Sequence, residues 1–411
     1  MQKNSIFNFS YSYLNLPEKF HSITKISSFP KLETFVINKK LLKSLNILID
    51  KKDDLANILA GKEKYNKSFS QAYAGHQFGN FTNLGDGRAI IIGEHVTKNK
   101  QLLDIQLKGS GITPYSRNGD GKATLKSMLR EYIISEAMHN LNIPSSRSLA
   151  IISTGEYIYR QTKEKGAILA RIMNSHIRVG TFEYASYLCS EDELKNLTTY
   201  TINRLYPELK NHKNPALALL NIVMEKQIDL IVNWMRVGFI HGVMNTDNTS
   251  IYGETFDYGP CAFINSYNPE KTYSSIDYNK RYSFGNQPMV LKWNISRFAE
   301  SLIPIIHKNK EKSIELAQSL INQFDKSWNK KFYKMMLSKI GIKTYEKKLF
   351  PLIDELLDIM KKNKLDYTNT FLTISQNYFD KNILIKESNF ALWIKKWKAS
   401  INKYSSKEEA K

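Results

Sequence analysis

The spacing of apolar and polar residues changes twice along the chain. Up to about residue 65, scattered apolar residues alternate with lysine- and aspartate-rich turns, and no motif there suggests chemistry. From 69 to 121, short apolar runs of strand type are separated by frequent glycines, a pattern typical of tight turns and of close backbone approach to a ligand. Beyond residue 176 the spacing favours helices. We therefore expect an α+β protein.

The glycine-rich stretch predicts a β-hairpin followed by a helix. The runs RAIIIGEHV (88–96) and LLDIQLKG (102–109) flank a lysine-containing turn, and a lysine ends the second strand. Residues 122–141 contain neither glycine nor proline and predict a helix, with Asn118 or Asp120 as its cap. Apolar residues cover much of its circumference, so we expect this helix to be buried on several sides.

Weaker patterns predict the remaining elements. These are strands at 149–154 and 166–172 and helices at 216–239, 295–324 and 345–361. The simplest partition has three parts: an N-terminal extension (1–65), a small β-rich N-lobe (66–175) and a larger, mainly helical C-lobe (176–411).

Composition narrows the function classes. With 411 residues, 42% of them apolar, the chain can bury a large core. It has no uncharged apolar run of about 18 residues and no basic-then-apolar start, so we expect a soluble, cytoplasmic protein without membrane contact. The net charge of +20 comes from lysines spread among other residue types, which favours a solvated surface over nucleic-acid binding. Cys189 and Cys261 form no metal or disulfide motif.

A lysine at a strand end, followed by a helix with an inward-facing acid, is the arrangement with which kinase-like enzymes hold ATP phosphates. Here the lysine is Lys108, and helical periodicity allows either Glu131 or Glu136 as its partner. Two glycine-rich turns lie nearby in sequence, and the amides of such turns can face phosphate oxygens. The first turn, LGDGRA (84–89), places Arg88 directly after two glycines, and the second, GSGITPYSRNGDGK (109–122), contains Asp120.

The segment HGVMNTDNTSIYGETFDYG (241–259) resembles the catalytic and metal-binding loops of kinase-related phosphotransferases. Asn248 stands seven residues after the histidine, and Asp257 opens a DYG similar to DFG. Magnesium prefers oxygen ligands, so we expect Asn248 and Asp257 to bind Mg²⁺. Val243 replaces the usual proton-accepting aspartate, whereas Asp247 lies beside Asn248. Arginine forks suit phosphate, but nothing in the sequence alone singles out Arg171 or Arg178.

Longer blocks resemble the selenoprotein O family of protein adenylyltransferases, pseudokinase-fold enzymes of bacteria and mitochondria. The similarity covers about residues 70–300 and includes YAGHQFGNF (73–81), QLKGSGITPYSRNGDGKATLKSMLREY (106–132), SHIRVGTFE (175–183) and VGFIHGVMNTDN (237–248). It implies a protein-kinase-like bilobal fold in a bacterial protein. It also implies transfer of AMP from ATP to Ser, Thr or Tyr hydroxyls of proteins, with ATP inverted relative to kinases.

The resemblance also implies roles for single residues. Asp247 would accept the proton, Asn248 and Asp257 would bind Mg²⁺ or Mn²⁺, and Glu131 rather than Glu136 would pair with Lys108. The implied ATP-binding residues are Gly85, Gly87, Arg88, Lys108, Asp120, Gly121, Arg171, Arg178 and Asp257.

This sequence departs from the family in its cysteines. Tyr273 stands where many bacterial members have a cysteine, and the chain ends at SSKEEAK (405–411) without a cysteine-containing tail. We therefore expect no redox control through a disulfide and a helical lobe truncated at its C-terminus. Two alternatives stay open: a catalytically inactive, ATP-binding pseudokinase scaffold and a protein kinase.

Overall fold

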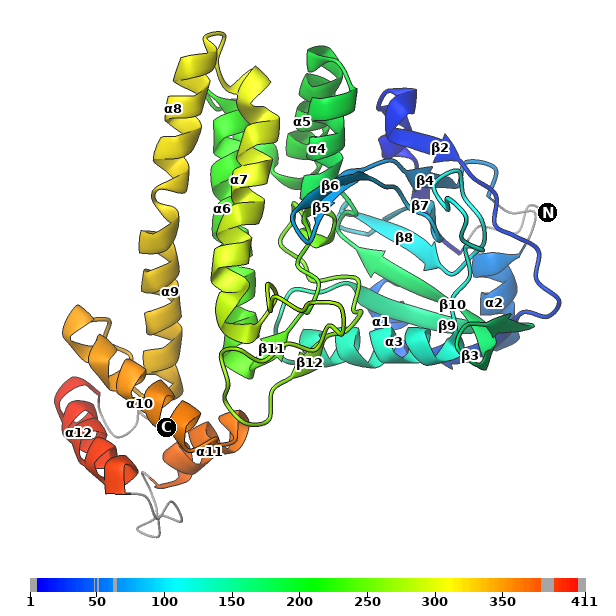
Figure 1. Cartoon of the computed structure of the whole chain (residues 1–411). Helices are drawn as coiled ribbons and strands as arrows, with labels where there is room; N and C mark the ends of the chain where they lie inside the picture. The colour runs from blue at the N-terminus through cyan, green and yellow to red at the C-terminus, as the bar shows by residue number, and fades with distance from the viewer. Residues whose placement is uncertain (1–5, 48, 50–51, 62–64, 378–387, 406–411) are drawn as a thin grey trace. The chain divides into compact units, whose positions relative to one another are not determined.

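A computed structural model describes residues 6–47, 49, 52–61, 65–377 and 388–405 (Figure 1). The predicted α+β class is confirmed, because most strands lie in the N-terminal part and the C-terminal part is mainly helical. The chain divides into two compact units. The first comprises Met1–Val223, Asn245–Tyr258 and Asn294–Gln318, and the second comprises Met224–Met244, Gly259–Trp293 and Ser319–Lys411.

An eight-stranded antiparallel sheet is the centre of the first unit. Its strand order is β2-β4-β7-β8-β10-β9-β3, and β1 pairs with β7. The predicted hairpin is present as β7–β8, and the two weaker strand predictions are parts of a longer hairpin, β9–β10. The strands are β1 (Phe9–Ser10), β2 (His21–Ile23), β3 (Glu33–Ile37), β4 (Phe69–Gln71), β7 (Ala89–Val96), β8 (Leu102–Lys108), β9 (Arg147–Tyr159) and β10 (Lys163–Met173).

The N-terminal residues contribute directly to this sheet. Strands β1, β2 and β3 come from the predicted extension, as do α1 (Lys39–Ser44) and α2 (Lys52–Ala60). The sequence pattern did not reveal these strands, because each is short and its partners are distant in sequence. The boundaries predicted near residues 65 and 175 stay predictions.

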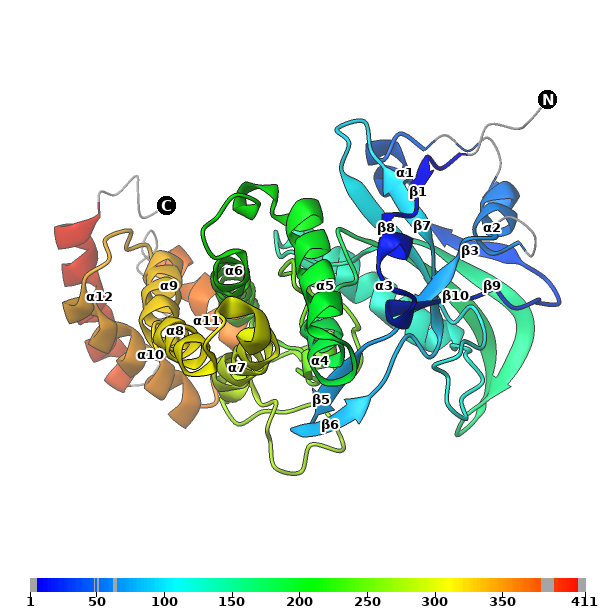
Figure 2. The same cartoon turned by 90° about the horizontal axis from the view of Figure 1, so that it is seen from above.

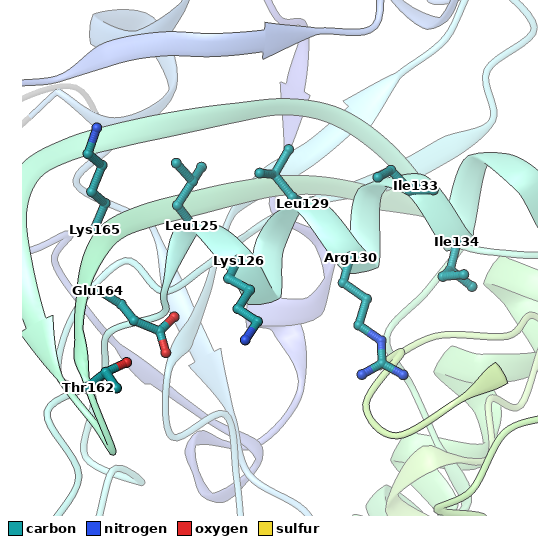
Figure 3. A pocket seen from close by; sticks show the side chains of 9 residues that line it. All are labelled: Leu125, Lys126, Leu129, Arg130, Ile133, Ile134, Thr162, Glu164 and Lys165. Carbon is teal, nitrogen blue, oxygen red and sulfur yellow. The ribbon is translucent and has the colours of Figure 1, made fainter. Parts of the chain in front are cut away.

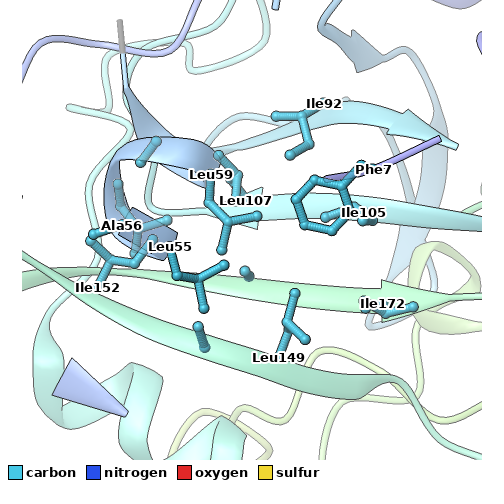
Figure 4. Close-up of a cluster of buried hydrophobic side chains, with 14 of the residues drawn as sticks. Phe7, Leu55, Ala56, Leu59, Ile92, Ile105, Leu107, Leu149, Ile152 and Ile172 are labelled. Carbon is cyan, nitrogen blue, oxygen red and sulfur yellow. The ribbon is translucent and has the colours of Figure 1, made fainter. Parts of the chain in front are cut away.

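The two faces of the sheet carry different apolar cores. On one face Leu107, Leu149 and Ile152 pack with Leu55 and Leu59 of α2 (Figure 4). The other core includes Ala123, Met128, Ile151, Ala167 and Leu169, of which Met128 belongs to α3 (Leu125–Asn140). Neighbouring strand residues such as Ile151 and Ile152 divide between the two cores because successive side chains point to opposite faces.

Helix α3 differs from its prediction in two respects. Thr124 caps it, since its hydroxyl accepts a hydrogen bond from the Ser127 amide at 3.3 Å, so neither Asn118 nor Asp120 is the cap. Burial on several sides is also wrong. One face, with Met128 and Glu131, packs on β9 and β10, whereas Ile133 on another face is 61% exposed.

The remaining helices agree with their predictions except in one region. A single helix at 295–324 is wrong, because Asn309 accepts a hydrogen bond from the Lys312 amide and starts a new helix there. The α-helices are α4 (Val179–Leu188), α5 (Glu191–Leu205), α6 (Pro215–Val237), α7 (Gln287–Ile306), α8 (Lys310–Ile321), α9 (Phe324–Lys339), α10 (Phe350–Lys362), α11 (Tyr367–Asn377) and α12 (Ser388–Tyr404).

No helix within the described ranges is both long and apolar enough to cross a membrane.

Several short elements complete the fold. The short elements are strand pairs β5 (Ala74–Gln77) with β6 (Asn80–Asn83) and β11 (Phe239–Ile240) with β12 (Ala262–Phe263), and the 3-10 helices η1 (Ser12–Asn15), η2 (Glu18–Phe20), η3 (Pro207–Leu209), η4 (Thr246–Asn248), η5 (Phe284–Asn286) and η6 (Lys347–Leu349).

In the second unit, tryptophans join α12 to its neighbours. Trp393 and Trp397 are fully buried and stack at 5.9 Å between ring centroids. Their indole N–H groups donate to the carbonyls of Leu352 and Ile340, both at 2.8 Å. Lys396, between them in sequence, is exposed and pairs with Glu355 at 2.8 Å. This face of α12 therefore has the solvated lysine expected from the sequence.

Arg204 of α5 ties that helix to the sheet through buried charges. Its guanidinium contacts Glu94 of β7 at 2.9 Å and Asp104 of β8 at 2.5 Å. The amides of Ser12 and Tyr13 also donate to Glu94, at 2.6 and 3.0 Å. Burial opposes ionisation of Asp104, but Arg204 and a histidine contact lower its pKa to about 2.

We expect Arg204→Met to lower the free energy of unfolding by about 3–5 kcal/mol, because it leaves two buried carboxylates without their cation. Urea unfolding followed by circular dichroism measures this change. Lys195→Met is the control: Lys195 forms an exposed pair with Glu191, and its loss should leave the midpoint unchanged. Equal midpoints for the two variants would contradict a structural role for Arg204.

Candidate functional site

Strand alternation decides which face of the sheet carries the candidate site. Lys108 follows Leu107, and Arg171 stands between Ala170 and Ile172, and these apolar neighbours all belong to the core on the α2 face. Successive side chains on a strand point to opposite faces, so Lys108 and Arg171 leave the sheet on the α3 face. The two residues come from adjacent strands, because β8 pairs with β10.

Two cations and two anions form a closed ring on this face. The Lys108 ammonium lies 2.7 Å from Glu131 and 2.5 Å from Asp257. Arg171 Nη1 lies 3.0 Å from Glu131 and 2.6 Å from Asp257. Each cation thus contacts both anions, which offsets the cost of burying four charges. The glutamate in the ring is Glu131, whereas Glu136 binds Arg147 at 2.7 Å.

Asp257 stands at a strained and strongly cationic position. Its backbone φ is 58°, in the left-handed region that residues other than glycine seldom adopt. Burial would raise the pKa of Asp257, but Arg171, Lys108 and Arg178 together hold it well below its usual range. Both hydrogen bonds that it accepts from described residues engage Oδ1. The carboxylate is therefore ionised and has its second oxygen available for a cation.

Arg178, at the start of α4, is buried with an incompletely satisfied guanidinium. It donates from Nη1 to the carbonyl of Asp247 at 3.1 Å, and it lies over the Tyr73 ring at 4.0 Å and the Phe256 ring at 4.9 Å. Nη2 lies 3.6 Å from Asp86, and within the described part of the chain it makes no hydrogen bond. A buried donor of this kind is suited to an anionic ligand.

Asp247 lies in the turn η4, and its backbone carbonyl accepts the hydrogen bond from Arg178. Its Oδ2 accepts a hydrogen bond from Gln77 at 3.4 Å, while Oδ1 is buried and has no hydrogen-bond partner among the described residues. Burial raises the pKa of Asp247 to about 6, against the lowering effect of Arg178. Gly75 approaches Asp247 closely. A Cβ at position 75 would lie 2.6 Å from Asp247 Oδ1, which favours glycine there.

The donor atoms present fit a hard divalent cation. Asn248 is half-buried in the same turn as Asp247, and Asp257 supplies an ionised carboxylate. Amide and carboxylate oxygens are ligands that Mg²⁺ accepts alongside water and phosphate. No group of three or more His, Cys, Asp or Glu suited to a metal occurs in the described ranges. The site would therefore depend on oxygens from the nucleotide to complete the coordination.

The glycine-rich turns have backbone shapes that only glycine adopts easily. Gly85 has φ 135°, and a Cβ there would lie 2.3 Å from the Tyr115 ring. Gly121 has φ 66°, and its Cβ would lie 2.0 Å from the Gly111 carbonyl oxygen. Gly87 is half-buried, Arg88 is exposed, and Asp120 forms an exposed pair with Arg160 at 2.9 Å. The structure thus brings Lys108, Arg171, Arg178, Asp247 and Asp257 together, while the ATP-binding roles of these turn residues stay predictions.

Two polar residues of this site were not predicted from the sequence. Asp86 faces Arg178, and burial raises its pKa to about 6. Gln106 accepts a hydrogen bond from Arg171 Nε at 2.8 Å. Asp86 could have been found, because it lies between two predicted phosphate-binding glycines. Gln106 carried no such signal beyond its place two residues before Lys108 in the strand.

A groove of about 690 Å³ lies on the outer face of α3, and none of the predicted site residues lines it (Figure 3). Apolar and cationic side chains of the helix form its walls together with polar residues of the β9–β10 hairpin. The lining residues are Leu125, Lys126, Leu129, Arg130, Ile133, Ile134, Thr162, Glu164 and Lys165.

A strand lysine that contacts both a helix glutamate and the aspartate of a DYG segment is typical of kinase-like, nucleotide-dependent transferases. The chain belongs to the family described as protein adenylyltransferase SelO, which it matches over residues 4–411. Membership places it among the protein nucleotidyltransferases and confirms the family predicted from the sequence motifs.

Curated relatives support this assignment over nearly the whole chain. A Brevibacillus brevis protein named protein nucleotidyltransferase YdiU is 46% identical over 407 residues, which cover 98% of this chain and 83% of the relative. Proteins of the same name from Pelagibacter ubique and Clostridium botulinum are each 48% identical, over 95% and 98% of this chain and 82% of each relative.

Solved structures give weaker similarity. A Toxoplasma gondii rhoptry antigen kinase domain matches 63% of this chain and 88% of its own at a TM-score of 0.25 and 12% identity. A Toxoplasma gondii virulence factor described as having a protein-kinase fold and no enzymatic activity matches 96% of both chains at 0.28 and 11%. Scores this low carry no argument about fold or function.

His176 helps to position the side chain of Arg178. Its carbonyl accepts a hydrogen bond from Arg178 Nε at 3.2 Å, and its Nδ1 lies 3.0 Å from Asp104. Burial lowers the pKa of His176 to about 4, although Asp104 opposes the shift while Arg171 and Arg178 add to it. His176 is therefore neutral in the folded protein at neutral pH.

We expect His176 to make folding sensitive to mild acid. Its folded-state pKa lies below the unfolded value of about 6.5, so the unfolded chain binds a proton that the folded chain does not as the pH falls. Between pH 7 and pH 5 the protein should lose about 2 kcal/mol more unfolding free energy than His176→Asn, whose amide can still donate to Asp104. Urea unfolding at both pH values measures this. Parallel losses in the two proteins would refute a buried neutral histidine.

Proposed function

We propose that the chain is a protein adenylyltransferase that moves AMP from ATP to Ser, Thr or Tyr hydroxyls of proteins and releases pyrophosphate. One observation carries the proposal. Arg178 Nη2 and Asp247 Oδ1 are both buried and both without a hydrogen-bond partner among the described residues, and Arg178 Nη1 donates to the backbone carbonyl of Asp247. A bound phosphate oxygen would satisfy the first atom, and an acceptor hydroxyl or a cation would satisfy the second.

The cationic side chains support binding of the triphosphate. Lys108 and Arg171 lie on one face of the sheet, and Arg178 lies at the start of α4. An arginine presents a planar fork that suits phosphate oxygens. We assign the same ligand to the two glycine-rich turns, whose amides can approach phosphates closely. The residues proposed there are Gly85, Gly87, Arg88, Asp120 and Gly121.

Asp247 is the residue that we assign as proton acceptor. A pKa of about 6 leaves it mostly ionised at neutral pH and still basic enough to accept a proton. The acceptor oxygen attacks the α-phosphorus, its proton passes to Asp247, and a P–O bond to the protein forms. The bond from the α-phosphorus to the bridging oxygen breaks, and pyrophosphate leaves with that electron pair. The guanidinium groups stabilise the charge that gathers on it.

Asn248 and Asp257 are the residues that would hold Mg²⁺ or Mn²⁺. A divalent ion supplies positive charge beside the phosphate oxygens and helps to orient them. The named relatives are bacterial, which supports a cytoplasmic location where ATP is made. The partners proposed are ATP and proteins with accessible hydroxyl side chains.

ATP labelled at either the α- or the γ-phosphate distinguishes the candidate activities. With Mg²⁺ or Mn²⁺ and an added acceptor protein, we expect label on protein from α-labelled ATP alone. Label from γ-labelled ATP alone would make the chain a protein kinase. ATP binding without transfer of either label would make it a scaffold. Gel electrophoresis and mass spectrometry of the modified residue provide the readout.

We expect Asp257→Ala to lower the transfer rate by at least about 100-fold, because the change removes an ionised group beside three cations. The rate of α-label incorporation measures this effect, and a thermal melt checks that the variant is folded. Glu315→Ala, which removes an exposed carboxylate of α8, is the matched control and should transfer AMP normally. Normal transfer by a folded Asp257→Ala protein would sink the site assignment.

A further inference from the structure

The hairpin β5–β6 is fastened to the turn that carries Asp247. The amide of His76 in β5 donates to the Thr246 hydroxyl at 2.7 Å, and Thr246 immediately precedes Asp247. Glu183 of α4 accepts a hydrogen bond from the same hydroxyl and lies 2.6 Å from His76 Nδ1. The hairpin lies beside α4 in both views (Figures 1 and 2). Hairpin, helix and catalytic turn are therefore joined by buried hydrogen bonds.

The outer side of this assembly presents aromatic side chains to solvent. Phe81 of β6 stands directly opposite His76 and is 41% exposed. Its ring lies 4.8 Å from that of Tyr187 in α4, which is 57% exposed, and the neighbouring Leu188 is 47% exposed. We refer to Phe81, Tyr187 and Leu188 as the aromatic platform. Such large, rigid side chains are enriched at protein interfaces because they bury much area at little entropic cost.

We propose that the aromatic platform docks the acceptor protein, by binding a large apolar side chain a few residues from the hydroxyl that receives AMP. This inference rests on the proposed function and adds a substrate preference to it. The occupant follows from continuity with the site. An acceptor hydroxyl must reach Asp247, and the chain that carries it must pass over the elements that hold Asp247.

The span between platform and catalytic turn suits an extended segment. Two steps separate Asp247's neighbour Thr246 from Phe81: the 2.7 Å hydrogen bond from the His76 amide to the Thr246 hydroxyl, and the pairing of His76 with Phe81 across the hairpin. With about 4.8 Å for the spacing of paired strands, the two steps amount to roughly 8 Å, or about two to three residues of extended chain. A leucine or an aromatic residue two to four positions from the acceptor would therefore reach the platform.

Rigid attachment explains how docking would favour the reaction. Holding the acceptor chain near the catalytic turn converts a bimolecular encounter into a local one, which raises the effective concentration of the hydroxyl. Because buried hydrogen bonds join Thr246 to the hairpin and to α4, the two elements that carry the platform, a bound apolar residue would be placed at a defined distance from Asp247. The platform is assigned to acceptor binding, and none of its three residues is among the cations assigned to ATP.

The double variant Phe81→Ala/Tyr187→Ala tests this assignment. We expect the KM for a protein acceptor to rise about tenfold or more, as for loss of aromatic anchors at interfaces, with kcat changed less. The affinity for a non-hydrolysable ATP analogue should stay as in the wild type. Tyr159→Ala removes an exposed ring elsewhere on the first unit, 72% exposed in β9, and should leave both quantities unchanged. An unchanged KM in the folded double variant would overturn the proposal.

Peptides test the substrate preference directly. A set of short peptides with one central serine or threonine, differing in whether a nearby position is leucine, phenylalanine or aspartate, is incubated with α-labelled ATP. Wild-type protein should favour the apolar positions, and the double variant should lose that preference. Transfer by the wild type without any such preference would overturn the platform but leave adenylyl transfer intact. Absence of α-label on peptides and on protein acceptors alike would instead refute the proposed function.

A second copy of this chain is the competing occupant. Sedimentation velocity over a range of concentrations compares the wild type with the double variant. Self-association that the double variant abolishes would assign the platform to an interface between copies and overturn acceptor docking. An unchanged monomer in both proteins is the result expected here.

Discussion

The closed ring of Lys108, Glu131, Arg171 and Asp257 is the interaction on which the site depends. It joins strands β8 and β10, helix α3 and the segment that carries Asp257. Removing four charges from water costs desolvation free energy. The attraction of each cation to two anions offsets this cost. Removal of any one member would leave an uncompensated charge. The ring thus fixes the relative positions of the groups assigned to phosphate and metal.

The sheet makes this ring possible by a simple geometric rule. Leu107, Ala170 and Ile172 fill the core beneath α2, so their strand neighbours emerge on the opposite face. The polar site and the apolar core are consequently two sides of the same strands. A shift of either strand by one residue would place its charged side chain in the α2 core, and the burial of that core holds the register.

Asp247 and Arg178 differ from the ring because they retain unsatisfied atoms. Folded proteins seldom leave buried donors and acceptors without partners, and Arg178 Nη2 and Asp247 Oδ1 are two such atoms within one site, which is why we assign a ligand to them. Membership of the SelO family is consistent with a nucleotide and an acceptor hydroxyl in these places. The hairpin β5–β6 extends the same structure outwards, since the Thr246 hydroxyl, in the turn that carries Asp247, bonds His76, and Phe81 opposite His76 lies in a solvent-facing pair with Tyr187.

The sequence by itself determined the α+β class, the hairpin that ends at Lys108, the helix that follows it and the family, because local periodicity and long motifs carry that information. Helical periodicity left Glu131 and Glu136 equivalent, and the family resemblance alone favoured Glu131. Packing on the sheet turns Glu131 to Lys108 and Glu136 to Arg147, which confirms that choice. The sequence placed Asp86 between two glycines without revealing its contact with Arg178, and it showed nothing of Gln106 or of the strands before residue 65, whose partners are distant in sequence. Tertiary structure decided these, because burial, strand register and long-range charge pairing exist only once the chain is folded.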